Sequence, residues 1–145
     1  HYYGTAVEIL KQTNGNITHF VAGVGTSGTL VGTAKKLIEF NPSIKIYASE
    51  PDTGFHGIEG WKHLPTSIIP GIYDQSLLSE TIRVSTESAY QNTIKLAHEE
   101  GLFIGPSSGA VFSACLELAQ EIDEGIIVTI FPDSSERYLS TNLWK

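Results

Sequence analysis

The fold is decided by residues 18–33, THFVAGVGTSGTLVGT, which predict a buried strand, a glycine-rich turn and the start of a helix. Residues 17–24 are apolar at nearly every position, which is typical of a strand covered on both faces. Residues 27–39 carry apolar side chains at helical spacing, and residues 44–50 predict the next strand. Strand, tight turn, helix and strand in this order predict a right-handed, parallel βαβ unit.

The turn in this unit combines glycines with hydroxyl side chains. The glycines are Gly23, Gly25 and Gly28, and the hydroxyls belong to Thr26, Ser27 and Thr29. The glycines relieve backbone crowding, while the hydroxyls stand beside N–H groups that a starting helix leaves unpaired. Because a helix N-terminus carries about half a positive charge, such a loop can hold a phosphate without Lys or Arg. The stretch therefore predicts a phosphate site.

The rest of the chain continues to alternate strands and helices. Residues 51–79 carry Gly and Pro at short intervals and predict mostly loop with a short helix, placed to line or cover a site. The other predicted elements are a helix at 2–13, a strand at 80–84, a helix at 86–100, an extended piece at 102–104, a helix within 105–122, a strand at 126–131 and a short helix or tail at 132–144. We expect one α/β domain over residues 1–145, an open, mostly parallel sheet with helices on both faces.

Composition narrows the possible partners to small molecules and proteins. The formal net charge is -7 and the nine basic residues are scattered, which disfavours nucleic acid or an anionic membrane. The sequence has one cysteine and no apolar run long enough to cross a bilayer, so we expect a cytoplasmic protein. Residue 1 is His and the first residues already resemble the interior of a helix, which suggests a piece of a longer chain.

A dinucleotide site is the main alternative for the glycine-rich turn. Residues 23–28 match G-x-G-x-x-G between a strand and a helix, and Glu50 ends the next strand where a ribose-binding acid belongs. However, a pyrophosphate lies along the backbone and needs a loop with few side chains. The three hydroxyl side chains of this loop suit a compact terminal phosphate better. A turn without any ligand is the third possibility.

A second loop, Ser107-Ser108-Gly109, also places hydroxyl side chains and a glycine at the start of a predicted helix. Ser107 or Ser108 can simply cap that helix. Because ligands of parallel α/β sheets bind beyond the carboxyl ends of the strands, a hydroxyl here can instead meet the far end of a flat phosphorylated ring.

Several ordered motifs along the chain resemble the cysteine synthase family, the O-acetylserine or O-phosphoserine sulfhydrylases, with cystathionine β-synthase as a relative. The motifs are GVGTSGTLVG, the strand end Ser49-Glu50-Pro51, the segment at 70–74, EEGLFIGPSSGA and SERYLST. The resemblance implies the type II fold of pyridoxal-phosphate enzymes. It also implies roles in cofactor and substrate binding. The phosphate would be bound by Gly25, Thr26, Ser27, Gly28 and Thr29, the pyridine nitrogen by Ser107, and Gly71 would lie beside the bound amino acid.

The implied reaction makes L-cysteine from an activated serine and sulfide. A neutral hydroxyl does not hold the pyridine nitrogen protonated as a carboxylate would, so the ring is a weaker electron sink. This suits loss of a β-leaving group followed by sulfide addition better than transamination. The resemblance also implies a homodimer and serine acetyltransferase as a possible partner.

The Schiff-base lysine of the family lies upstream of the region that this chain resembles. No lysine of the chain stands in a matching motif, so we expect the C-terminal, cofactor-binding half of such an enzyme, without catalytic residues and inactive alone. A non-catalytic interaction module derived from the fold is the remaining alternative.

We expect structural or surface roles for the histidines and a core position for the cysteine. The five histidines show no metal-binding pattern, and Cys115 lies on the apolar face of a predicted helix. Trp61 and Tyr73 in the irregular middle can gate a pocket or simply pack.

Overall fold

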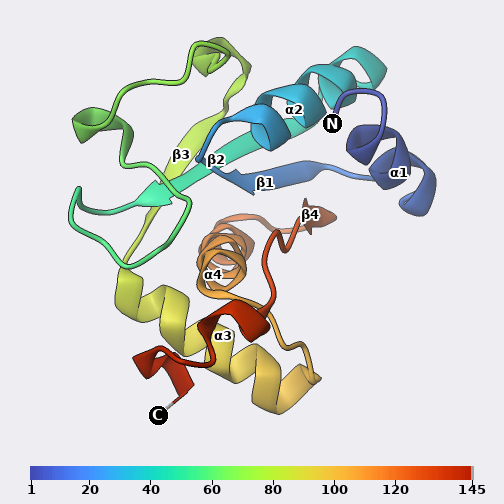
Figure 1. Ribbon diagram of the computed structural model, residues 1–145. Helices are drawn as coiled ribbons and strands as arrows, with labels where there is room; N and C mark the ends of the chain where they lie inside the picture. Colours follow the sequence, from blue (N-terminus) through green and yellow to red (C-terminus); the bar gives the residue numbers. More distant parts are fainter. Residues whose placement is uncertain (145) are drawn as a thin grey trace.

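The computed structural model describes residues 1–144, and their strands form one parallel sheet (Figure 1). The strands are β1 (His19–Gly23), β2 (Lys45–Pro51), β3 (Glu80–Val84) and β4 (Ile127–Thr129), in the spatial order β3-β2-β1-β4. His19 of the inner strand β1 pairs with Lys45 of β2 on one side and with Ile127 of β4 on the other. The carboxyl ends of the strands therefore meet at one edge of the sheet, and the expected open α/β fold is confirmed.

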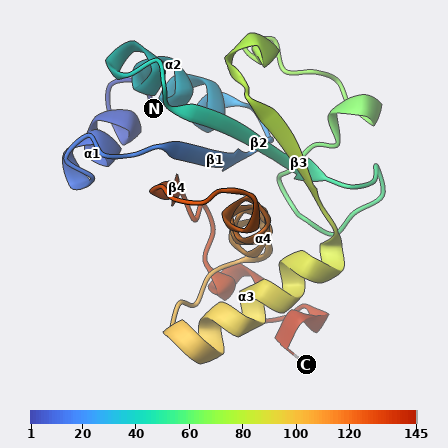
Figure 2. The ribbon, with the colours of Figure 1, turned by 180° about the vertical axis from the view of Figure 1, so that it is seen from behind.

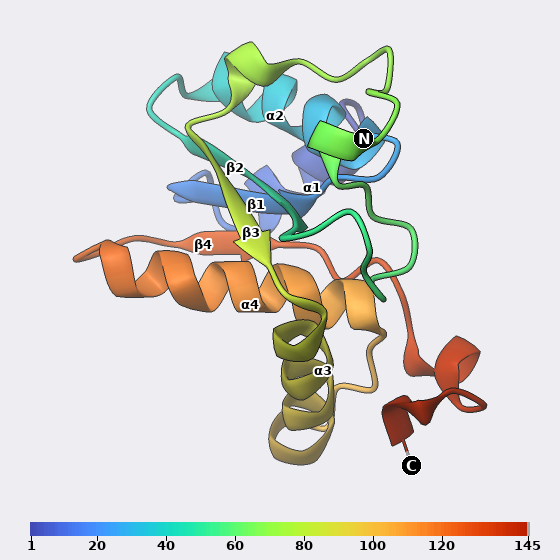
Figure 3. The ribbon, with the colours of Figure 1, turned by 90° about the vertical axis from the view of Figure 1, so that its left-hand side faces the viewer.

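Helices cover both faces of this sheet, as Figures 2 and 3 show from behind and from the side. The helices are α1 (Thr5–Gln12) and α2 (Gly28–Phe40) on one side, with α3 (Thr86–Glu100) and α4 (Pro106–Glu121) on the other. On that second side α4 lies directly against the strands, and α3 packs on α4.

The apolar run of β1 divides between two cores, one on each face. Phe20 packs in the first core with Leu30 and Leu37 of α2, whereas Val21 packs in the second with Val111 of α4. All five side chains are at most 1% exposed. Because successive side chains of a strand point to opposite faces, a strand buried on both sides needs this continuous apolar sequence.

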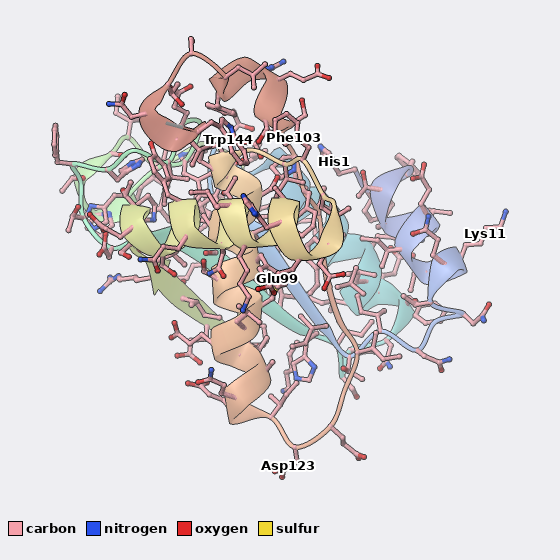
Figure 4. The ribbon with its side chains drawn as sticks, turned by 90° about the horizontal axis from the view of Figure 1, so that it is seen from below. His1, Lys11, Glu99, Phe103, Asp123 and Trp144 are labelled. Carbon is pink, nitrogen blue, oxygen red and sulfur yellow. The ribbon has the colours of Figure 1, made fainter. Side chains whose placement is uncertain are left out.

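The helix α3 crosses over α4 (Figure 4). Gly109 of α4 lies where the two helices come closest. A Cβ at this glycine would lie 2.1 Å from Thr93 Oγ1 and 2.3 Å from the carbonyl oxygen of Ala89, both on α3. The buried Thr93 hydroxyl donates to the Ala89 carbonyl at 2.8 Å. The two helix backbones therefore approach so closely that only glycine fits, which fixes the position of the first turn of α4.

The remaining segments are mostly irregular, as the sequence predicts for the long connection and for the end of the chain. The long connection after β2 contains only the 3₁₀ turns η1 (Leu64–Thr66) and η2 (Gln75–Leu77), and the end of the chain forms η3 (Ser135–Tyr138) and η4 (Asn142–Trp144). The expected extended piece at 102–104 is reduced to a single antiparallel bridge between Ile104 and Ser134. Nearby, the rings of Phe103 and Trp144 pack with their centroids 5.0 Å apart, and both are labelled in Figure 4. Within residues 1–144 no helix is both long and apolar enough to span a membrane.

Candidate functional site: a cofactor pocket

A cavity of about 250 Å³ lies at the carboxyl end of β1, between the starts of α2 and α4. Residues from four segments line it: Ala22, Gly23, Gly25, Thr26, Ser27, Gly28 and Thr29 from the glycine-rich stretch, Glu59, Gly60 and Trp61 from the long connection, Ser107 and Val111 from α4, and Ile130 and Pro132 after β4. The structure thus brings the glycine-rich loop and Ser107 to one cavity, although about 80 residues separate them in sequence.

The start of α2 has the features of an anion site. Its N-cap residue Ser27 has left-handed backbone angles, φ 70 and ψ 2, and no side chain caps the helix. The Ser27 hydroxyl is buried without a hydrogen-bond partner. A buried, unpaired hydroxyl is costly, and the first N–H groups of a helix need acceptors. A phosphate bound in the cavity would supply acceptors to both, so the residues present fit such a group.

The glycines of the loop have different structural roles. A Cβ at Gly23 would lie 2.3 Å from the indole of Trp61, and one at Gly25 would lie 2.5 Å from the carbonyl oxygen of Gly60. These two glycines admit the chain segment that forms the opposite wall of the cavity. At Gly28, by contrast, a Cβ would meet nothing closer than 3.8 Å, so this position borders open space where a ligand can approach.

His1 stands behind the loop and contacts it. Its Nε2 lies 3.2 Å from Thr29 Oγ1, and its Nδ1 lies 2.8 Å from Thr5 Oγ1. Gly32, one turn further along α2, leaves room for residues 1 and 2, since a Cβ there would lie 3.0 Å from His1 Cβ and 3.3 Å from the Tyr2 N atom. Sequence reasoning assigned the histidines to structural or surface positions and missed this contact, because no local pattern links residues 28 positions apart.

The first turn of α4 is capped by Asp133 and not by its own serines, so the expected cap at Ser107 or Ser108 is wrong. The helix begins at Pro106, its N-cap is Gly105, and both serines lie inside the first turn. Their N–H groups donate to Asp133, from Ser107 to Oδ2 at 3.2 Å and from Ser108 to Oδ1 at 3.0 Å. Ser107 is 5% exposed and its residual surface faces the cavity.

Two other residues singled out in the sequence lie away from the cavity lining. Glu50 is buried, where Oε2 accepts the N–H of Leu64 at 3.1 Å and Oε1 accepts Nε of Arg83 at 3.2 Å. The dinucleotide alternative therefore lacks its ribose-binding acid at the cavity. Gly71 lies in an exposed turn of the long connection, and a Cβ there would meet nothing within 4 Å.

The aromatic residues of the long connection also separate. Trp61 forms a wall of the cavity against the end of β1, while Tyr73 packs against the core on the α2 side.

Cys115 is buried in the other core, and burial raises the pKa of its thiol to about 12, so it is a poor nucleophile. Over residues 1–144 the His, Cys, Asp and Glu side chains form no cluster suited to a metal ion.

The fold and the cavity define a class: a parallel α/β protein with a cavity between two helix N-termini, whose lining fits a phosphorylated ligand. The sequence model of the pyridoxal-phosphate dependent enzyme family matches residues 1–133, and the chain belongs to this family. The cofactor of the family is pyridoxal phosphate, and the architecture is the type II fold of these enzymes.

Relatives with assigned activities agree with the family. The chain is 49% identical over 148 residues to a cysteine synthase of Aquifex aeolicus, covering 99% of this chain and 45% of that protein. It is 41% identical over 151 residues to an O-acetylserine dependent cystathionine β-synthase of Bacillus subtilis, covering 99% and 49%. The crystal structure of an O-acetylserine dependent cystathionine β-synthase from Helicobacter pylori superposes with a TM-score of 0.90 at 39% identity, covering 99% and 49%. The chain spans about half the length of the curated relatives it matches, and the resemblance to cysteine synthases is confirmed.

Proposed function

We propose that this chain is the cofactor-binding C-terminal part of a cysteine synthase, which makes L-cysteine from an activated serine and sulfide. The observation that carries the proposal is the single cavity shared by the uncapped start of α2 and by Ser107. An uncapped helix start with an unpaired Ser27 hydroxyl suits a phosphate, and a neutral hydroxyl at the other side suits a pyridine nitrogen.

The chain's own residues then have separate roles. Residues 25–29 bind the phosphate, with the N–H groups and the helix dipole of α2 balancing its charge. Trp61 and Val111 contribute apolar surface that limits the access of water to the ring. Pyridoxal phosphate, when bound, supplies an electron sink for the α-carbon of the amino acid. Ser107 keeps that sink weak because a neutral hydroxyl does not hold the ring nitrogen protonated, which favours β-replacement.

The rest of the proposed site includes a part of the protein outside this chain. No lysine of residues 1–144 lines the cavity, so we place the Schiff-base lysine in another part of the protein. Gly71 is proposed to lie beside the bound amino acid once that part is in place. The donor is O-acetylserine or O-phosphoserine. We further propose a cytoplasmic homodimer with serine acetyltransferase as a protein partner.

The test is a calorimetric titration of the full-length protein, freed of its bound cofactor, with pyridoxine 5'-phosphate, which lacks the aldehyde and therefore binds without a lysine. Pyridoxine, without the phosphate, and NADH are the comparison ligands. We expect binding of pyridoxine 5'-phosphate, at least tenfold weaker binding of pyridoxine, and no binding of NADH. Tight NADH binding without pyridoxine 5'-phosphate binding would refute the cofactor assignment.

The activity is tested separately, by measuring cysteine formation by the full-length protein from sulfide with O-acetylserine and with O-phosphoserine. Turnover with either donor supports the proposed reaction. Cofactor binding without cysteine formation from either donor would favour the non-catalytic interaction module.

A further inference from the structure

The carboxylate of Asp133 has four donors around it, all from two short segments. Oδ1 accepts the N–H of Ser108 and also its hydroxyl, while Oδ2 accepts the N–H of Ser107 and the Tyr138 hydroxyl, the last at 3.2 Å. A backbone hydrogen bond connects the same two segments, because the N–H of Gly105 donates to the Asp133 carbonyl at 3.1 Å. Asp133 thus fixes the first turn of α4 from a segment that follows β4.

The neighbouring glycine is shaped for this contact. A Cβ at Gly105 would lie 2.3 Å from Asp133 Oδ2 and 2.6 Å from Cε2 of Tyr138. Any other residue at the N-cap would push the carboxylate and the phenol away from the helix start. The absence of a capping side chain at Gly105 and the presence of Asp133 are therefore two parts of one arrangement.

The carboxylate also changes the electrostatics of this end of the cavity. The start of α4 carries about half a positive charge, which by itself disfavours a proton on a nearby ring nitrogen. Asp133 places a negative charge against the same N–H groups and offsets it. Burial and the Asp133 carboxylate raise the pKa of Tyr138 to about 12, so the phenol stays a neutral donor to Asp133.

We propose that Asp133 is a positioning residue for the cofactor: it holds the Ser107–Ser108 turn so that the Ser107 hydroxyl faces the cavity, and its charge sets the electrostatics at the ring nitrogen. The inference rests on the proposed site, in which Ser107 faces that nitrogen. Because Asp133 satisfies the Ser107 N–H, it leaves the Ser107 hydroxyl available for a ligand. No hydrogen bond within the described residues engages that hydroxyl.

The experiment measures the affinity and the ultraviolet absorption spectrum of pyridoxine 5'-phosphate bound to the full-length protein after removal of its bound cofactor. The spectrum reports the protonation of the ring, which a purely structural role would not change. The variants are Asp133→Asn, Ser107→Ala and the double variant. The matched control is Asp74→Asn, because Asp74 also caps a short turn, accepting the Ser76 N–H at 3.1 Å, but lies outside the cavity lining.

We expect Asp133→Asn to weaken binding by on the order of tenfold and to shift the spectrum, because it removes the charge and one acceptor. In the Ser107→Ala background the additional loss of affinity should be much smaller, since Asp133 supports binding by positioning Ser107, whereas its charge acts on the spectrum. Asp74→Asn should bind as the wild type does.

Two results would overturn the inference. A folded Asp133→Asn variant with wild-type affinity and spectrum leaves Asp133 no role at the cofactor, and a full additional loss in the Ser107→Ala background means that it does not act through Ser107. If Asp133→Asn does not fold, the second variant is Tyr138→Phe, which keeps the carboxylate but removes one of its donors. This variant should show a weaker shift of the same spectrum. An unchanged spectrum counts against the proposal. Failure of the wild type to bind at all refutes the proposed site itself, and the role of Asp133 with it.

Discussion

Replacing Gly109 by alanine should destabilise the protein, although alanine is the better helix former. The exchange favours an isolated helix by about 1 kcal/mol. Against this, the new Cβ would lie 2.1 Å from Thr93 Oγ1, 2.3 Å from the Ala89 carbonyl oxygen and 2.8 Å from the Thr93 N atom. Two of these three atoms belong to the backbone of α3, so no side-chain rotation relieves the contact.

The magnitude follows from these contacts. Ordinary Cβ contacts lie beyond 3.4 Å, so α3 and α4 must separate by roughly 1 Å. Overpacking of this kind costs about 1–3 kcal/mol. The separation also breaks the bond from the buried Thr93 hydroxyl to the carbonyl of Gly105, the N-cap of α4, at about 1 kcal/mol more. After the helix-propensity gain, we expect a net loss of about 1–3 kcal/mol in the free energy of unfolding.

The assay is urea unfolding of the full-length protein followed by circular dichroism, with Gly4→Ala as the matched control. A Cβ at Gly4 meets nothing within 4 Å, so this variant should unfold as the wild type does. Because Ser107 lies two residues before Gly109, the displaced helix should also bind pyridoxine 5'-phosphate more weakly. A Gly109→Ala protein that is as stable as the wild type, or more stable, would refute the close packing of α3 on α4.

Three further predictions concern the cavity and its surroundings. Thr26→Ala should weaken pyridoxine 5'-phosphate binding by about 1–2 kcal/mol in a calorimetric titration. The control Thr53→Ala, in an exposed part of the long connection, should not change the affinity. Equal affinities of the two variants would mean that the phosphate does not bind at the glycine-rich loop. His1→Ala removes the partner of the Thr29 hydroxyl and should lower the same affinity by severalfold while leaving the binding of pyridoxine, which lacks the phosphate, unchanged. The raised pKa of Tyr138, about 12 when folded against 10.0 as the ordinary value, means that the unfolded chain loses this proton first as pH rises. Stability should therefore fall between about pH 10 and 12, and Tyr138→Phe should flatten that part of a stability profile measured by urea unfolding; an unchanged profile would contradict the assigned pKa.

The succession of strands and helices along the chain and the meeting of two helix starts were predictable from sequence because they follow from local patterns and one topological rule. The spatial order of the strands, β3-β2-β1-β4, was not predicted. Apolar runs gave the buried strands, and the common direction of parallel strands brought the glycine-rich loop and Ser107 to one edge. The family motifs then distinguished a pyridoxal phosphate site from a dinucleotide site, and the buried position of Glu50 agrees with that choice.

What sequence reasoning missed are contacts between distant residues. His1 reaches Thr29, and Asp133 reaches Ser107 across 26 positions, with no periodicity to indicate either pair. The serine-rich start of α4 predicted a local cap, but the distant carboxylate replaced it, because Pro106 shifts both serines into the first turn. The left-handed backbone of Ser27 was likewise hidden, since this conformation usually indicates glycine.

The contact between Asp133 and the start of α4 also has a consequence for the order of events during synthesis on the ribosome. The phosphate loop and Ser107 are translated first, yet the first turn of α4 is complete only when residue 133 has emerged and folded back on it. A nascent chain stalled before this residue would hold the loop but not a fixed Ser107. The side of the cavity that meets the ring should therefore be completed late in translation, after the phosphate loop has been made.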